Sequence, residues 1–241
     1  MLEQKKEPGG VGRLPPLPSN TVVVTAPTWQ VTDVDSALAF DLAMESLTQA
    51  SLIAVDTETF GYQTGHVGAP TPESVGTLGL LQIGFPAEKS TFLLDPFALD
   101  RSGIDWVGAL RPLIESSNPQ KIIHNALFER AVFAGRGITL DAGVIDTCAL
   151  ARVLMPKLEG SYPGLKRASL QALAAALLGQ TIGKEEQTSD WSRRPLTERQ
   201  RDYAALDVEL ATDLFTVLER VASFHGIDPR AIDWRTSVHR R

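Results

Sequence analysis

The order of the apolar segments constrains the fold of this 241-residue chain more than any other feature. Three runs in succession, at 51–57, 78–85 and 91–95, have the length and composition of strands. Two further short strands are expected at 121–124 and 144–147, and helical patterns alternate with them. Strands that first follow one another and then alternate with helices predict an α/β domain with a mixed sheet.

Helices are expected in the intervals between these strands, where apolar residues recur at helical spacing. The first begins near Asp33, with Asp33 or Asp35 as its N-cap. The last begins at Thr197, which forms a capping box with Gln200, and continues to about Phe224. The others are predicted at 104–115, 126–134, 147–154 and 169–178.

The ends of the chain differ from its middle. Residues 1–30 contain five Pro and three Gly, which predicts a flexible tail over 1–19 and a short edge strand at 21–25. One folded domain is expected over 20–224, followed by a C-terminal tail over 225–241. Within the domain, the Gly- and Pro-rich segment 61–77 is predicted to be a long surface loop.

Composition narrows the possible settings and partners. The single cysteine, Cys148, cannot form an internal disulfide, so a reducing, cytoplasmic location is expected. No apolar stretch approaches the roughly 20 residues that span a bilayer, so no membrane association is expected. The net charge of −6 is unusual for a protein that coats nucleic acid, but metal ions at a site can offset it. No phosphate-binding Gly-Lys-Ser loop is present, and no nucleotide cofactor is expected.

Two carboxylates stand together at the end of the first core strand, in Asp56-Thr-Glu58. Strand side chains alternate in direction, so residues two apart share a face. Both acids therefore point the same way beside an apolar run, and their burial is costly unless a cation binds them. The alternative from these residues alone is a solvated strand end with acids that cap a helix.

Two later segments place further acids on predicted helices. Glu129 falls in the first turn of one helix, where the helix dipole alone also favours an acid. Tyr203 and Asp207 lie four residues apart on one helical face, and an exposed pair is the ordinary alternative. Together, four converging carboxylates would repel one another unless divalent cations held them. Hard oxygen ligands favour Mg²⁺ or Mn²⁺, and two such ions about 3.5–4 Å apart support in-line phosphoryl chemistry.

These segments resemble the DEDD superfamily of 3′–5′ exonucleases in its tyrosine subclass, which includes ribonuclease D, the Werner-type exonuclease and the proofreading domain of DNA polymerase I. The likeness covers about residues 33–220 and makes 20–224 the exonuclease domain. It implies a ribonuclease H-like fold, with a mixed five-stranded sheet flanked by helices. The matching segments are Ile53-Ala-Val-Asp-Thr-Glu58, Leu78-Gly-Leu-Leu-Gln-Ile83, Phe92-Leu-Leu-Asp-Pro96, Ser169-Leu-Gln-Ala-Leu, Lys184, Gln187-Thr-Ser-Asp-Trp-Ser-Arg-Arg-Pro-Leu196, Gln200 and Tyr203-Ala-Ala-Leu-Asp207.

The resemblance implies a role for each residue of these motifs. Two divalent cations, Mg²⁺ or Mn²⁺, would be held by Asp56, Glu58, Glu129 and Asp207. Tyr203 would orient the attacking water. Contacts to the terminal nucleotide are expected from Thr59, Asn125 and Phe128, although Phe128 could equally be a core residue.

One position departs from the family's pattern. The second motif usually ends in Asp, and this chain has Glu129, which is one methylene longer. The nearest spare carboxylate is Asp146, which is expected to cap the following helix rather than to reach the metals.

Trp191 is expected to pack between loop and helix. The nearby arginines either track a phosphate backbone or form ordinary ion pairs; they are Arg193, Arg194, Arg199 and Arg201.

The leading hypothesis is a metal-dependent 3′–5′ exonuclease that acts on single-stranded nucleic acid with a free 3′ end. It would release nucleoside 5′-monophosphates by a two-metal mechanism. The alternative, motivated by Glu129, is a catalytically silent domain that binds nucleic acid or a partner protein. Discrimination between RNA and DNA depends on contacts to the 2′-OH, which the sequence does not place.

Overall fold

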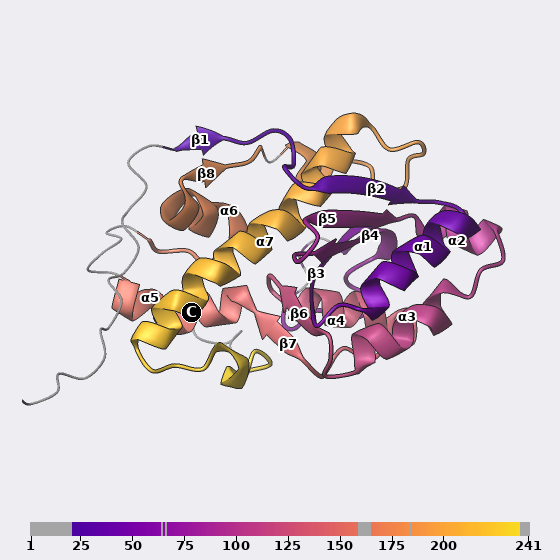
Figure 1. Ribbon diagram of the computed structural model, residues 1–241. Helices are drawn as coiled ribbons and strands as arrows, with labels where there is room; N and C mark the ends of the chain where they lie inside the picture. The colour runs from indigo at the N-terminus through magenta and orange to yellow at the C-terminus, as the bar shows by residue number, and fades with distance from the viewer. Residues whose placement is uncertain (1–20, 64, 66, 159–164, 184, 237–241) are drawn as a thin grey trace, which may run out of the picture.

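The computed structural model describes residues 21–63, 65, 67–158, 165–183 and 185–236. Its centre is a six-stranded sheet in the order β2-β5-β4-β3-β6-β7 (Figure 1). Strand β4 is antiparallel to β3 and β5, and the other neighbours are parallel. The mixed α/β fold predicted from the sequence is therefore confirmed. The strands are β2 (Gln30–Val34), β3 (Leu52–Phe60), β4 (Thr77–Phe85), β5 (Ser90–Leu94), β6 (Gln120–Ile123) and β7 (Val144–Asp146).

The prediction of five strands was wrong by one, because β2 occupies a position that the sequence pattern assigned to the start of a helix. Strand β2 contains Val31, Thr32 and Val34, which favour extended backbone, and it pairs in parallel along the whole of β5. The helix α1 (Ala37–Thr48) begins after it, and Ser36 rather than Asp33 or Asp35 is its N-cap. The apolar periodicity of α1 hid the strand that precedes it.

Helices cover both faces of the sheet and enclose two apolar cores (Figure 1). One core contains α1, α3 and α4, and the other contains α5, α6 and α7. A short helix not predicted from the sequence follows β5 and is capped by Asp95. The bounds are α2 (Pro96–Arg101), α3 (Trp106–Glu115), α4 (Leu127–Ala134), α5 (Thr147–Leu158), α6 (Leu170–Leu173), the π-helical turn η1 (Ala174–Leu178), the 3-10 turn η2 (Glu185–Thr188) and α7 (Glu198–Phe224).

The alternation of side chains along β3 determines which face receives the acids. Ile53 and Val55 belong to the core under α1 and α3, whereas Ala54 belongs to the core under α7. Residues 56 and 58 continue the series of Ala54 and so project on the α7 face. The strand thus carries its carboxylates toward the longest helix of the molecule.

Helix α7 lies close to the sheet because small residues separate them. A side chain added at Gly84 of β4 would lie 3.3 Å from Cβ of Ala54 and 3.4 Å from Cβ of Val208. The predicted capping box at Thr197 and Gln200 is present and fixes the start of this 27-residue helix. This close approach brings Asp207, the neighbour of Val208, next to Asp56 and Glu58 of β3.

The two ends of the described chain pack on the domain. Strand β1 (Val22–Val23) pairs with β8 (Gln180–Thr181) in a separate two-stranded sheet, so the strand expected near 21–25 is present but does not extend the main sheet. Glu209 of α7 accepts hydrogen bonds from the backbone N–H groups of Thr28 and Trp29. The predicted tail over 1–19 lies outside the described residues.

The segment after α7 differs from the predicted tail over 225–241. It contains the 3-10 turn η3 (Pro229–Ala231), and Trp234 is only 3% exposed, packed in the core under α1. Packing of the domain therefore extends past residue 224 to Trp234, and 237–241 lie outside the described residues. Among the described helices, none is long and apolar enough to cross a membrane.

Candidate active site

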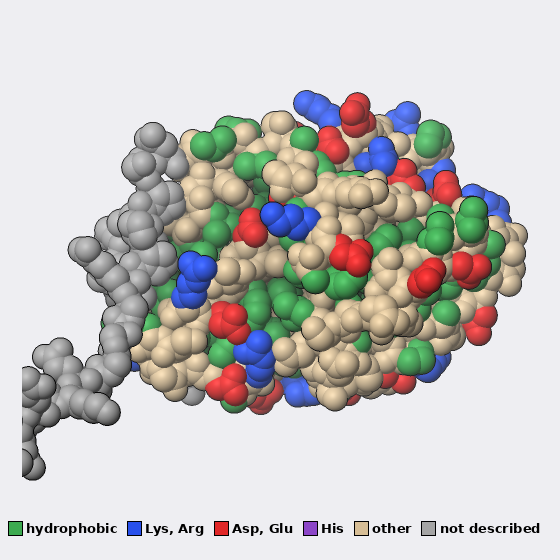
Figure 2. All heavy atoms as spheres, in the orientation of Figure 1, with side chains coloured by type: hydrophobic (Ala, Val, Ile, Leu, Met, Phe, Trp, Pro, Cys, Tyr) green, Lys and Arg blue, Asp and Glu red, His purple; other side chains and the backbone are tan. Residues whose placement is uncertain are grey.

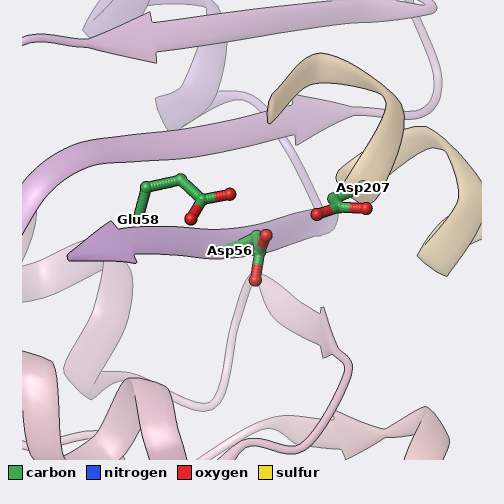
Figure 3. Close-up of side chains that lie close together, drawn as sticks. All are labelled: Asp56, Glu58 and Asp207. Carbon is green, nitrogen blue, oxygen red and sulfur yellow. The ribbon is translucent and has the colours of Figure 1, made fainter. Parts of the chain in front are cut away.

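Three carboxylates meet where β3 passes beneath α7. Asp56 and Glu58 project from β3, and Asp207 projects toward them from α7 (Figure 3). One carboxylate oxygen of each lies within 4.8 Å of the others. The sequence prediction that these motifs converge is reflected in this geometry for three of the four acids.

Burial and mutual repulsion disfavour the ionised state of these acids. Burial, partly offset by a hydrogen bond from the Thr57 backbone, raises the pKa of Asp56 to about 7. Burial and then the charges of Asp56 and Asp207 raise the pKa of Glu58 well above its ordinary value. The pKa of Asp207 is raised by burial and by Asp56, and its Oδ1 is buried without a hydrogen-bond partner among the described residues.

The donor set fits a hard divalent cation. The three side chains offer only oxygen ligands, which Mg²⁺ and Mn²⁺ prefer. A cation bound between them would offset the burial and the mutual repulsion that disfavour their ionised forms. The residues that are present therefore agree with a divalent-metal site.

Glu129 lies beside this group without belonging to the set of three. It is 2% exposed, and its Oε1 accepts a 3.4 Å hydrogen bond from the Thr57 hydroxyl. Its carboxyl group contacts that of Asp56, and burial and then the charge of Asp56 raise its pKa. Its Oε2 is buried and has no partner among the described residues. The longer side chain thus still reaches Asp56, but from the α4 side.

Tyr203 stands one helical turn before Asp207 on α7. Its hydroxyl donates a hydrogen bond to Asp207, and its ring lies 6.4 Å from the ring of Trp191 between centroids. Burial and then the negative charges of Asp207 and Glu58 raise its pKa, so the phenol stays protonated. Trp191 is 1% exposed, which confirms that it packs against the helix.

A cleft of about 780 Å³ runs past these residues, a size within the range of ligand sites. Figure 2 shows one face of the molecule. Acidic and basic side chains are interspersed on this face, without one continuous basic band. The predicted contacts Thr59, Asn125 and Phe128 all line the cleft. So do residues for which the sequence analysis expected no contact with a nucleotide; among these are Tyr62, Gln63, Cys148 and Arg152.

The turn into α4 is fixed by Asp146, as a cap. Its carboxylate accepts hydrogen bonds from the backbone N–H groups of Asn125, Ala126, Cys148 and Ala149. Asn125 adopts a left-handed backbone with φ 72°, which Asn tolerates better than most residues. The expectation that Asp146 caps the following helix is confirmed.

The arginines before Tyr203 are partly engaged in ion pairs. Arg194 pairs with Asp95 at 2.6 Å and stacks over the ring of Phe97. Arg201 pairs with Asp33 at 2.8 Å. These two arginines are structural, as the alternative interpretation of the arginine cluster predicted. Arg193 and Arg199 are exposed.

Comparison with known proteins agrees with the geometry. A family model described as 3′-5′ exonuclease matches residues 32–222. Ribonuclease D of Shewanella sp. (strain ANA-3) is 32% identical over 170 residues, which cover 70% of this chain and 38% of that protein. Ribonuclease D of Pseudomonas paraeruginosa is 30% identical over 197 residues, 81% of this chain and 45% of that protein.

A solved structure shows the same fold. The crystal structure of Escherichia coli ribonuclease D has a TM-score of 0.62 and 25% identity, over 82% of this chain and 46% of that one. The chain thus spans less than half the length of these ribonuclease D relatives. The family match covers most of the chain and includes β3, α4 and α7 with their acids. The chain belongs to the 3′–5′ exonuclease family of the DEDD superfamily.

Proposed function

We propose that this chain is a metal-dependent 3′–5′ exonuclease that removes nucleotides from the 3′ end of single-stranded nucleic acid. The observation that carries the proposal is the meeting of Asp56, Glu58 and Asp207 within 4.8 Å in a cleft of about 780 Å³. Carboxylates from separate elements converge in this way where a divalent ion is to be held. Membership of the exonuclease family supplies the reaction class.

Each side chain of the site has a place in this reaction. Asp56, Glu58 and Asp207, with Glu129 beside Asp56, would hold two divalent cations, Mg²⁺ or Mn²⁺. Such a pair, when bound, activates a water and stabilises the leaving 3′-oxygen. Water adds to the phosphorus, the P–O3′ bond breaks, and the terminal nucleotide leaves as a 5′-monophosphate. The shortened strand keeps a 3′-hydroxyl and can enter the next cycle.

Tyr203 acts through hydrogen bonding rather than as a base. Its raised pKa keeps the phenol protonated, so its hydroxyl can donate a hydrogen bond to Asp207. The phenol oxygen can at the same time accept a hydrogen bond from the attacking water and so orient it. The ring of Trp191 packs against the ring of Tyr203. Tyr203 is therefore proposed as the residue that orients the attacking water.

The remaining cleft residues suit the terminal nucleotides. Tyr62 is 50% exposed in the cleft wall and offers an aromatic face for stacking a base, as does Phe128. Asn125 and Thr59 offer hydrogen bonds to sugar and phosphate. Arg152 lines the same cleft and adds a positive charge to it. RNA is the favoured substrate because the relatives compared are ribonucleases D.

A catalytically silent binding domain is the second candidate, and Glu129 favours it. Its carboxyl group contacts Thr57 and Asp56 instead of joining the group of three oxygens. A domain of this kind would keep the cleft and bind nucleic acid without cleaving it.

The free buried Cys148 agrees with a reducing compartment, and we propose a cytoplasmic location for either function.

Product analysis tests the proposed reaction. Single-stranded RNA with a free 3′-hydroxyl should be shortened from that end, with nucleoside 5′-monophosphates as products in a mass spectrum. The same RNA with a 3′-phosphate block, or joined into a circle, should persist. Cleavage of the circle, or release of 3′-monophosphates, would contradict the assignment.

Replacing Tyr203 by phenylalanine is expected to lower kcat about 10- to 100-fold, because a hydrogen bond to a charged group contributes about 1.5–3 kcal/mol. The ring and its packing on Trp191 stay, so stability should change little. Metal-induced stabilisation should persist because the three carboxylates are untouched. Single-turnover kinetics beside thermal melts checks this, and an unchanged kcat would remove Tyr203 from the mechanism.

Glu129 variants separate the two candidate functions. Glu129→Gln is expected to lower kcat about 10- to 100-fold, the usual loss for an outer ligand partner. Glu129→Asp, the residue usual in the family, should retain more activity than the glutamine variant. If the aspartate variant is active and the wild type is not, the chain is a silent domain. Equal activity of all three proteins would show that Glu129 has no role.

A further inference from the structure

Gln82 of β4 carries a buried side-chain amide. Its side chain is 0% exposed, and neither Oε1 nor Nε2 has a partner among the described residues. A buried polar group left unpaired destabilises a fold, and an apolar side chain of similar size would be cheaper at this position. The presence of glutamine here therefore calls for a reason outside the packing of the core.

The register of the sheet places Gln82 next to the carboxylate cluster. Gln82 is directly opposite Asp56 in the antiparallel pair of β3 and β4. Residues directly opposite share a face, with Cβ atoms about 4.5–5.5 Å apart. The Gln82 side chain therefore projects beside Asp56 into the layer between the sheet and α7. At Gly84, two residues along the same face, an added Cβ would lie 3.4 Å from Cβ of Val208, so this face of β4 packs closely against α7.

An unpaired acceptor lies in the same layer. Asp207 Oδ1 is buried without a hydrogen-bond partner in the described part of the chain, and Asp207 has a carboxylate oxygen within 4.8 Å of one of Asp56. Among the described residues, Gln82 thus has an amide donor with no acceptor in the same layer as a carboxylate oxygen with no donor. A glutamine side chain has three rotatable bonds, enough to turn its amide between Asp56 and Asp207.

We infer that Gln82 is a positioning residue of the site, whose side-chain amide orients the carboxylates of Asp56 and Asp207 for metal binding. The inference rests on the proposed function. An amide can donate from nitrogen to a carboxylate oxygen that does not face the cation, which fixes the rotation of that carboxylate. Partners of this kind around metal ligands typically change metal affinity or activity by about 10- to 100-fold.

The test replaces the amide by apolar groups of similar size, in Gln82→Met and Gln82→Leu. Thr91→Val is the matched control, because the Thr91 hydroxyl is also fully buried and has no hydrogen-bond partner among the residues that the structure describes. Thr91 of β5 lies opposite Gly84, whereas Gln82 lies opposite Asp56, so Thr91 is farther from Asp56 than Gln82 is. Each protein is melted in EDTA and in a Mn²⁺ titration, and its kcat and KM on single-stranded RNA are measured.

The three proteins should melt in EDTA at or above the wild-type temperature, because each variant removes an unpaired buried polar group. Gln82→Met and Gln82→Leu should need about 10-fold more Mn²⁺ for half of the thermal shift and should lose about 10-fold in kcat, with little change in KM. Thr91→Val should keep the wild-type Mn²⁺ titration and kcat.

The outcomes separate this inference from the proposed function. A wild-type protein that shows no Mn²⁺ shift and no cleavage would refute the proposed function itself. A wild type that responds to Mn²⁺, with Gln82→Met matching it in titration and kcat, would refute the role of Gln82 alone. An equal loss in Thr91→Val would also refute it, because the effect would then be one of core packing. If Gln82→Leu does not fold, Gln82→Met decides the question.

Discussion

Replacing Asp207 by asparagine is expected to lower kcat on single-stranded nucleic acid by about 10³-fold or more, a loss of about 4 kcal/mol of transition-state stabilisation. The amide has nearly the same shape as the carboxylate but no charge, and it is a poor ligand for a hard cation. Asp207 is one of the three acids whose oxygens lie within 4.8 Å. Its loss removes a ligand and the acceptor of the Tyr203 hydroxyl.

The same variant is expected to be more stable than the wild type when metal is absent. The charge of Asp207 helps to raise the pKa of Glu58, so its removal relieves repulsion in the buried group. Asp213→Asn is the matched control: Asp213 is a partly buried acid of the same helix, beside Glu209 and away from β3. Asp213→Asn should keep wild-type kcat. A kcat of Asp207→Asn within 10-fold of the wild type would contradict the assigned site.

The stability of the metal-free protein is expected to fall as pH rises from 6.5 to 8. An acid whose pKa is raised on folding binds its proton more tightly in the folded state, so its stabilisation is lost as pH rises through the folded pKa. For Asp56 that change runs from 3.8 to about 7, and the raised pKa of Glu58, Glu129 and Asp207 extends the loss upward.

The buried basic groups His124 and Lys121 change the stability of the protein mainly outside pH 6.5 to 8. Burial lowers the pKa of His124 from 6.5 to about 4, so its contribution is complete above 6.5. Burial lowers the pKa of Lys121 from 10.5 to about 8, so its contribution changes mainly above 8. Divalent ions compete with the protons of the carboxyl groups, and the thermal shift caused by Mn²⁺ should therefore grow across the same window.

Thermal melts in EDTA and in Mn²⁺ at a series of pH values measure both trends. The Asp207→Asn protein should show a shallower fall in EDTA, because one of the coupled acids is gone. Metal-free stability that rises from pH 6.5 to 8, or a Mn²⁺ shift that shrinks, would contradict the buried acidic cluster. Both slopes arise from the titration of the same acids, and only the second also requires the metal.

The sequence predicts the elements that its local patterns determine. Strands β3 to β7 and helix α7 follow from apolar runs and from the capping box at Thr197, all of which are local signals. The missed strand β2 is stabilised by pairing with β5, a contact between segments about sixty residues apart. Its five residues are too few to dominate the helical periodicity that follows.

The site shows the same division. Asp56, Glu58 and Asp207 could be grouped because strand and helix periodicities place them on one face each. Gln82 could not, because its importance arises from its register opposite Asp56. Tyr62 and Arg152 line the cleft only because the loop after β3 and helix α5 border the same cleft. No spacing along the chain contains that information.

The central claim is metal-dependent removal of nucleotides from a free 3′ end at Asp56. Its most direct test is a gel time course on 5′-labelled single-stranded RNA and DNA of one sequence, each with Mn²⁺, with Mg²⁺ and with EDTA, beside the Asp56→Asn protein. The expected result is a ladder that shortens from the 3′ end only with metal, is absent in the variant and is faster on RNA. No shortening of either strand with either metal, or equal shortening by wild type and Asp56→Asn, would contradict the claim.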